Sequence, residues 1–467
     1  MTPASLTNPS LPNAAKPSAP LALRPHEVRL DTILLYGTFG LLMFGPLAFG
    51  AVEPWATFVL QSGATLLLLL WLGKQIRRGE LNIQGHPLFL PMGVFGLLIG
   101  LQVLFHRSSY RHDTISAALQ YCAYAMLCFV ASQTVRRVSQ ARKLAVILSI
   151  YGAAIATFAL LQGLSPNGKL YWLRRPRLGG WIYGPYVNHN HYAGLMETLV
   201  PIPLVLCLSH LAGTKARVAA GAAAAVMAGT IFLSGSRGGM LAFIGEMVVL
   251  AVVLVQRRRG MRSALTAGAI LALLISLLAW VGGSELNRRM RSIGSETRTE
   301  LSGGMRASIA RDSLRMFAKK PILGWGLAAF PVVYPQFRSF YTNFFINEAH
   351  NDYLQLLVEM GALGFLTMLW FLVTLYRRAF SKLGDWMSDT NGAVALACML
   401  GISGILVHSV VDFNLHIPAN AALFYVLGTI AAAPPLAQRA RRRHSVRYQN
   451  PAGLGFSDSA SAPACRT

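Results

Sequence analysis

Apolar residues recur along the chain in long runs separated by shorter polar segments. A helix needs about 20 apolar residues to cross the ~30 Å hydrocarbon core of a bilayer, and the runs reach this length about a dozen times. They predict membrane-spanning helices near residues 32–51, 55–73, 87–105, 114–132, 144–163, 192–211, 216–233, 240–256, 264–282, 354–376, 392–411 and 418–434. The pattern therefore predicts an all-α polytopic membrane protein with about 12 transmembrane helices.

The polar segments divide this predicted bundle into five parts. Residues 1–30 are rich in Pro, Ala and Ser and contain no long apolar run, so they predict a disordered cytoplasmic tail. Residues 31–282 hold the first nine spans, and residues 283–353 form a large outer loop. The last three spans lie within residues 354–434, and residues 435–467 form a basic cytoplasmic tail.

Composition supports the membrane assignment. Only 13% of the 467 residues are charged, about half the share in a typical soluble domain, which excludes a conventional globular enzyme. The 42 Lys and Arg residues outnumber the 18 Asp and Glu residues and give a net charge of +24. In a soluble chain this excess would indicate nucleic acid binding, but here the expected partners include membrane lipids and no nucleic acid. The five cysteines form no CxxC pair and predict neither a disulfide nor a zinc site.

Basic loops predict the orientation of the bundle. With the N-terminus in the cytoplasm, the basic segments after the second, fourth, eighth, tenth and twelfth spans all lie inside, as the positive-inside rule requires. The exceptions on the outer side are Arg174, Arg175, Arg177, Arg237 and ten Lys or Arg residues within 283–353. An anionic ligand at the outer surface would explain them, because guanidinium groups pair bidentately with phosphate. The alternative is that a long loop crosses regardless of its charge.

The outer loop has a recognisable internal pattern. Residues 304–319 predict an amphipathic helix, which Pro321 ends. The following Pro321-Ile-Leu-Gly324-Trp-Gly326 segment predicts a tight backbone turn, since glycine adopts conformations that other residues avoid.

Glu348, His350 and Asp352 lead directly into the tenth span, where ionisable groups are costly unless they are paired or used. Three interpretations remain open. A metal site is the least favoured, because the i, i+2, i+4 spacing does not place all three side chains on one helix face. His350 could instead cap the helix, or it could act as a general base, because imidazole titrates near neutral pH.

A second candidate is the turn Ser234-Gly-Ser-Arg237-Gly-Gly239 after the seventh span. Its glycines let the backbone approach a ligand closely, and the N–H groups at the start of the next helix favour phosphate. The alternative is an arginine that extends to the lipid headgroups.

Together these motifs resemble those of the O-antigen ligase and polymerase family of bacterial envelope enzymes. The resemblance runs from about Leu178 to Leu375. The motifs that carry it are Arg177-Leu-Gly-Gly with Asn188-His-Asn190-His-Tyr-Ala, Ser-Arg237-Gly-Gly, Pro321-x-x-Gly324-x-Gly326, Ala349-His350-Asn351-Asp352-Tyr353-Leu354-Gln355 and Glu359-Met-Gly361. It implies a GT-C-like membrane glycosyltransferase with a large periplasmic loop. The implied activity is transfer of a glycan from an undecaprenyl-diphosphate carrier at the periplasmic face of the bacterial inner membrane, without a metal or cofactor.

Carried onto this sequence, the resemblance places the catalytic histidine of the family at His350 and its essential loop arginine at Arg237. His350 would deprotonate the acceptor hydroxyl. Arg237 and Arg177, with Arg338 as a further candidate, would bind the departing diphosphate.

Three more residues are expected to support this site. Asp352 or Glu348 would orient the imidazole, and Asn190 would lie nearby. Since nothing in the sequence looks like the closely paired carboxylates of a retaining enzyme, we expect a single displacement with inversion.

The expected acceptor is lipid A–core, which makes O-antigen ligation the predicted function. A polymerase of O antigen or exopolysaccharide, with a second lipid-linked glycan as acceptor, is the first alternative, because the segment from His408 to Asn420 is typical of family members from exopolysaccharide loci. Transfer to protein is less favoured, as no sizeable domain follows Pro434, and a transporter is less favoured because few ionisable groups lie near the bilayer midplane. His408 and Asp412 are four residues apart and could pair on one helix face.

Overall fold

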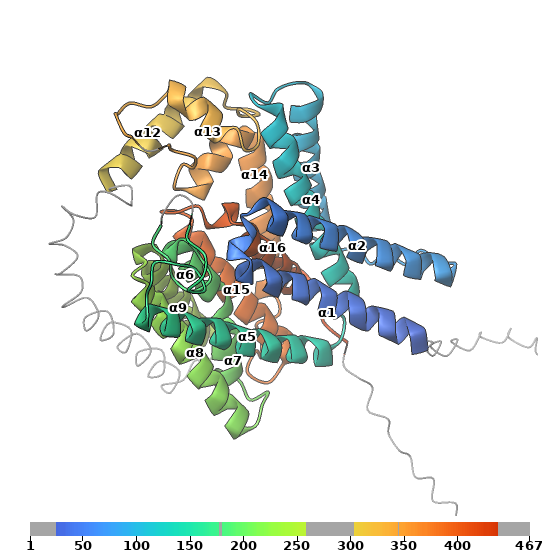
Figure 1. Cartoon of the computed structure of the whole chain (residues 1–467). Helices are drawn as coiled ribbons and strands as arrows, with labels where there is room; N and C mark the ends of the chain where they lie inside the picture. Colours follow the sequence, from blue (N-terminus) through green and yellow to red (C-terminus); the bar gives the residue numbers. More distant parts are fainter. Residues whose placement is uncertain (1–24, 177–179, 258–302, 344, 438–467) are drawn as a thin grey trace, which may run out of the picture.

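The structure is a computed structural model, and it describes residues 25–176, 180–257, 303–343 and 345–437. Within these ranges the regular elements are helices, and nine of them are long and apolar enough to cross a membrane (Figure 1). This confirms the predicted class, an all-α polytopic membrane protein. Two shorter apolar helices join the nine, in which His189–Leu208 counts as one span although it consists of two helices. The predicted span 264–282 lies outside the described residues.

The predicted spans match the helices one by one, apart from one interruption. The apolar helices are α1 (Pro25–Leu47), α2 (Pro54–Arg78), α3 (Phe89–Leu104), α4 (Arg111–Thr134), α5 (Val138–Leu164), α6 (His189–Leu199), α7 (Pro201–Leu208), α8 (Thr214–Ser234), α9 (Arg237–Arg257), α14 (Asp352–Phe380), α15 (Thr390–His408) and α16 (Pro418–Ala432). The predicted span 192–211 covers both α6 and α7. Pro201 separates these two helices, because it has no N–H to continue the hydrogen-bond ladder.

Within the described residues, the basic segments that follow α4 and α14 lie at the same end of the bundle. There, the backbone N–H of Val138 donates to the carbonyl of Ala437 at 3.2 Å, and Lys382 Nζ donates to the carbonyl of Ala433 at 2.8 Å. The ends of α4, α14 and α16 therefore meet the starts of α5 and α15 at this end. His350 and the starts of α6 and α9 lie at the opposite end.

The centre of the bundle is built on α15 and α16, which are largely buried between the other helices (Figure 1). Small residues let α15 approach its neighbours: a Cβ added at Gly401 would lie 2.5 Å from the carbonyl oxygen of Thr198 on α6, and one added at Gly404 would overlap the carboxyl of Glu246 on α9. Close packing of this kind is how helices associate in lipid.

The described part of the outer loop, which begins at residue 303, folds into a small helical unit, drawn at the top of Figure 1 beside the start of α14. Helix α12 (Gly303–Lys319) confirms the amphipathic helix predicted from the sequence, and it is followed by α13 (Phe330–Val333) and η4 (Tyr334–Gln336). Ile309 and Met316 on α12 pack against Phe330, Tyr334 and Val358 in a separate apolar cluster. The loop is therefore held against α14 by a core of its own.

A kink in α14 receives the glycine-rich turn. Gly361 has a φ of 65°, which favours glycine, and its backbone approaches the carbonyl of Ile322 so closely that a side chain there would clash. The N–H groups of Trp325 and Gly326 donate to the carbonyls of Val358 and Glu359 at 2.9 and 3.0 Å. These contacts fix the outer loop relative to the membrane-spanning helices.

Candidate functional site

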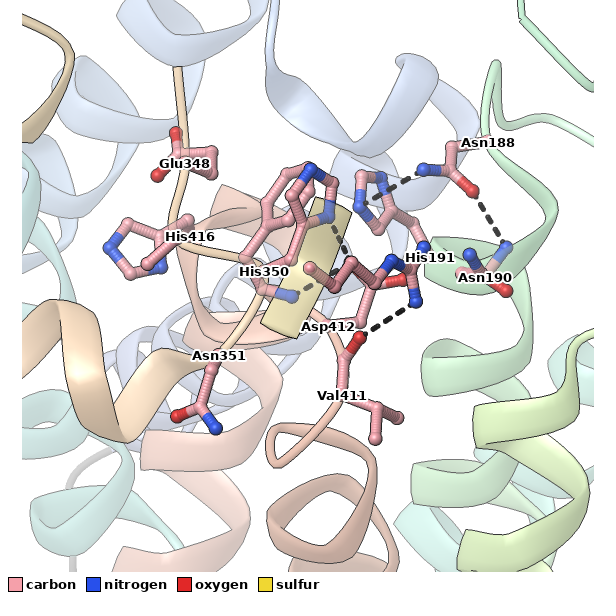
Figure 2. Close-up of polar contacts among 12 residues, drawn as sticks. Asn188, Asn190, His191, Glu348, His350, Asn351, Val411, Asp412 and His416 are labelled. Carbon is pink, nitrogen blue, oxygen red and sulfur yellow. Dashed lines mark hydrogen bonds and ion pairs between the residues drawn. The ribbon is translucent and has the colours of Figure 1, made fainter. Parts of the chain in front are cut away.

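His350 lies directly before α14, at the end of the bundle that carries the outer loop. Its φ of 53° turns the backbone sharply, and its side chain is 16% exposed. The imidazole Nδ1 lies 3.8 Å from Oδ1 of Asp412, in the loop after α15 (Figure 2). Among the described residues, Asp412 provides the only carboxylate within ion-pair distance of this ring. Catalytic contacts are often this long before substrate binds.

Asp412 is buried, with 2% of its side chain exposed. Burial alone would raise its pKa, but the imidazoles of His350, His191 and His408 hold the pKa of this carboxyl well below its usual range. Its Oδ1 also accepts a hydrogen bond from the backbone N–H of Phe413 at 2.8 Å. Asp412 therefore lies beside His350 as a carboxylate.

The Phe413 ring lies between two imidazoles. Its centroid is 5.0 Å from that of His350 and 4.8 Å from that of His191, in edge-to-face arrangements. His191 also lies 3.5 Å from the amide nitrogen of Asn188. His191 and Asn188, at the start of α6, thus line the same site (Figure 2).

Asp352, expected to orient the imidazole, instead binds the loop that follows α15. Its Oδ2 accepts hydrogen bonds from Ser409 Oγ at 2.6 Å and from the N–H of Leu415 at 3.1 Å, and its Oδ1 lies 2.7 Å from His416 Nδ1. Burial would lower the pKa of His416, but the carboxyls of Glu348 and Asp352 raise it to about 10. Asp352 therefore fixes the segment that carries Asp412.

Glu348 lies on the same side as His416 (Figure 2) and accepts a short hydrogen bond from Gln355. Burial raises the pKa of the Glu348 carboxyl, and His416 partly offsets this effect. Glu348 and Asp352 thus lie close to His416, and Asp412 takes the position beside His350 that sequence reasoning expected one of them to hold.

Arg237 begins α9, and its side chain is exposed. The turn before it is held by short-range contacts: Ser234 Oγ accepts from the N–H of Ser236 at 3.2 Å, and Ser236 Oγ accepts from the N–H of Gly239 at 3.1 Å. A Cβ at Gly238 would lie 2.5 Å from the His408 ring and 3.0 Å from Val411. Arg237 therefore begins its helix beside the loop that carries Asp412.

A second arginine, which the sequence did not single out, approaches the site from the outer loop. Arg306 on α12 donates from Nη1 to the carbonyl of Val411 at 3.0 Å. Its Nε is buried and makes no hydrogen bond with any described residue. The guanidinium is thus placed next to Asp412 with part of its donor capacity unused.

The other predicted residues lie further from this pair or outside the described part. Asn190 is in the first turn of α6, where its N–H donates to Asn188 Oδ1 at 2.8 Å. Arg338 is exposed after η4, with its N–H donating to the carbonyl of Tyr334 at 3.1 Å. Arg177 lies outside the described residues.

Arg174, one of the outer arginines assigned to an anionic ligand, has a structural contact. It forms an ion pair with Glu53 at 2.9 Å and lies 4.7 Å above the Phe49 ring. These contacts join the loop after α5 to the loop after α1. They account for Arg174 without a bound anion.

The predicted pairing of His408 with Asp412 is wrong. Helix α15 ends at His408, so Asp412 is no longer on its face, and His408 Nδ1 lies 2.9 Å from Oε1 of Glu197 on α6. The His408 imidazole is paired with Glu197, and the Asp412 carboxylate lies beside His350. In the part of the chain that the structure describes, no three His, Cys, Asp or Glu side chains are grouped so as to hold a metal ion.

A comparison with protein families finds one match. The family model described as O-antigen ligase matches residues 222–369. These residues make up about a third of the chain, and this segment is similar to O-antigen ligases. No curated protein matches the chain significantly. The O-antigen ligase match spans Arg237, Arg306 and His350, whereas Asp412 follows it, so the case for Asp412 depends on its position beside His350.

Proposed function

We propose that this protein transfers a glycan from an undecaprenyl-diphosphate carrier to a hydroxyl of lipid A–core, at the periplasmic face of the bacterial inner membrane. The observation that carries the proposal is the His350–Asp412 pair at a bundle end, with Arg237 and Arg306 beside the same loop. The match of residues 222–369 to O-antigen ligases supports a lipid-linked glycan as donor and a glycan-accepting substrate in general.

His350 acts as the general base in this proposal. A proton on Nδ1 faces the Asp412 carboxylate, which leaves the lone pair of Nε2 to accept the proton of the acceptor hydroxyl. Asp412 then stabilises the imidazolium that forms. A partner of this kind also fixes which ring nitrogen is protonated.

Arg237 and Arg306 stabilise the leaving group. The diphosphate of the donor is already a good leaving group. The protein therefore has to stabilise the negative charge that develops on the diphosphate as its bond to the sugar breaks. A guanidinium remains charged at all physiological pH values and binds phosphate oxygens in pairs. The reaction is a single displacement that inverts the anomeric centre, and its independence from metal ions stays a prediction.

A transfer assay with purified full-length protein tests this proposal. With lipid-linked O antigen as donor and lipid A–core as acceptor, His350→Ala should lower turnover by at least ~10²-fold, the usual contribution of a general base. Thermal stability and donor binding should remain near the wild-type values. His112→Ala is the control, because His112 is exposed in the first turn of α4.

Two results would overturn the proposal. Substantial transfer by His350→Ala would remove the base. Transfer to a second lipid-linked glycan, with none to lipid A–core, would make the protein a polymerase.

A further inference from the structure

An apolar cavity of about 260 Å³ lies between α5, α7 and α15, away from the site described above. Phe39 of α1 and Leu427 of α16 close its inner side. Its walls are almost entirely aliphatic and include Leu144, Leu148, Ile202, Val205, Ala393 and Ala397. An apolar cavity of ~150 Å³ stays free of water and binds apolar ligands, so this larger one is suited to hydrocarbon.

The cavity lies at the end of the bundle opposite to His350. Its rim includes Val135 and Ala141, where α4 gives way to α5, and Thr390, the first residue of α15. Along α5 it extends from Ala141 to Leu148, which is about 10 Å of helix rise. This depth is about a third of the hydrocarbon core, a distance that part of an extended acyl chain can fill.

Arg142 is the one residue with a cationic side chain among those that line the cavity. Arg142 is exposed, and its Nε donates to Thr390 Oγ1 at 3.0 Å, which holds the guanidinium at the rim. Its two terminal nitrogens make no hydrogen bond within the described ranges. A fixed guanidinium with free donors above an apolar cavity is complementary to a phosphate joined to a hydrocarbon chain.

We propose that this cavity seats one acyl chain of an anionic glycerophospholipid, whose phosphate binds the guanidinium of Arg142. The cavity lies at the end of the bundle that carries Arg142 and Thr390, so the lipid enters from the leaflet at that end. The site is separate from the glycan-transfer site and does not depend on the proposed reaction.

Lipid titration with native mass spectrometry of the purified full-length protein tests this site. Phosphatidylglycerol should bind the wild type more tightly than phosphatidylcholine of the same acyl chains. Arg142→Gln should weaken phosphatidylglycerol binding about tenfold, the loss expected for one charge-assisted contact. Lys143→Gln is the matched control, because it removes the same charge from the next residue, which is exposed and does not line the cavity. It should bind as the wild type does.

A second measurement does not require any variant to fold. Phosphatidylglycerol with a photoreactive group in its acyl chain should crosslink to residues of α5, α7 and α15 that line the cavity. Crosslinks confined to other helices, or equal weakening by Arg142→Gln and Lys143→Gln, would overturn the proposal. Tighter, Arg142-dependent binding of undecaprenyl phosphate would assign the cavity to a polyprenyl chain and would also overturn it.

Discussion

Replacing Asp412 with asparagine removes one charge beside His350 and keeps the size of the side chain. The amide oxygen of the new side chain can still accept the hydrogen bond from the N–H of Phe413. At the observed separation of 3.8 Å, two unit charges attract by about 4 kcal/mol at an effective dielectric constant near 20, and by about 2 kcal/mol if solvent doubles that constant. This attraction is gained only when His350 takes up the proton, so its loss raises the barrier to transfer. At about 1.4 kcal/mol per decade, turnover should fall between ~30-fold and ~10³-fold.

The assay is steady-state transfer at saturating donor and acceptor, with kcat and KM determined separately. The fall should be in kcat, because Asp412 acts on the proton acceptor and does not touch the donor. Asp385→Asn is the control, since Asp385 is exposed at the opposite end of the bundle. Turnover of Asp412→Asn within ~3-fold of wild type, with an unchanged thermal midpoint, would refute the role of this carboxylate.

Three further predictions concern the arginines, the neighbouring imidazole and metal ions. Arg237→Lys and Arg306→Gln should each lower turnover on the order of 10²-fold, by analogy with the loss of one oxyanion donor. Arg311→Gln is the control and should have little effect on turnover, because Arg311 is exposed on α12. Equal losses of turnover in all three variants would indicate misfolding of the loop instead. The pKa of His416 is raised to about 10, so its charge stabilises the fold fully below about pH 6.5 and this contribution is lost as pH rises through about 10. The thermal midpoint should therefore fall more between pH 7 and 10 in the wild type than in His416→Gln, and parallel curves would contradict this. Excess EDTA should leave the rate of transfer unchanged. A loss of activity that magnesium or manganese reverses would instead support a metal site at Glu348 and Asp352.

The helices could be predicted from the sequence because the bilayer sets their length. Eleven of the apolar runs correspond to helices in the described ranges, and α12 follows from its amphipathic period and Pro321. The sequence also singles out His350, because it lies in a short motif of polar residues at a predicted membrane boundary; its role as a base stays a prediction. In each of these cases, the residues that determine the feature are close together in the sequence.

The partners of these residues could not be predicted, because they come from distant segments. Asp412 meets His350 only after α14 and α15 have crossed the bundle, and sequence spacing alone favoured the nearer His408. Arg306 is one of ten cations in the outer loop, and only its contact with Val411 distinguishes it. Arg174 showed the opposite error, since Glu53 lies far away in the sequence.

In the proposed mechanism, the charge that His350 acquires would act on both the Asp412 carboxylate and the leaving group. Arg306 donates to the carbonyl of Val411, and Gly238, the residue after Arg237, lies close to Val411. A diphosphate held by both arginines would therefore lie close to the Asp412 carboxylate, which would repel it. Asp412 is buried, however, and the His350 imidazole lies against it. If His350 takes the proton as proposed, its new positive charge would attract both the Asp412 carboxylate and the negative charge that develops on the diphosphate. In the proposed mechanism, the same protonation would therefore stabilise the leaving group, so that transfer of the proton and departure of the diphosphate would favour each other.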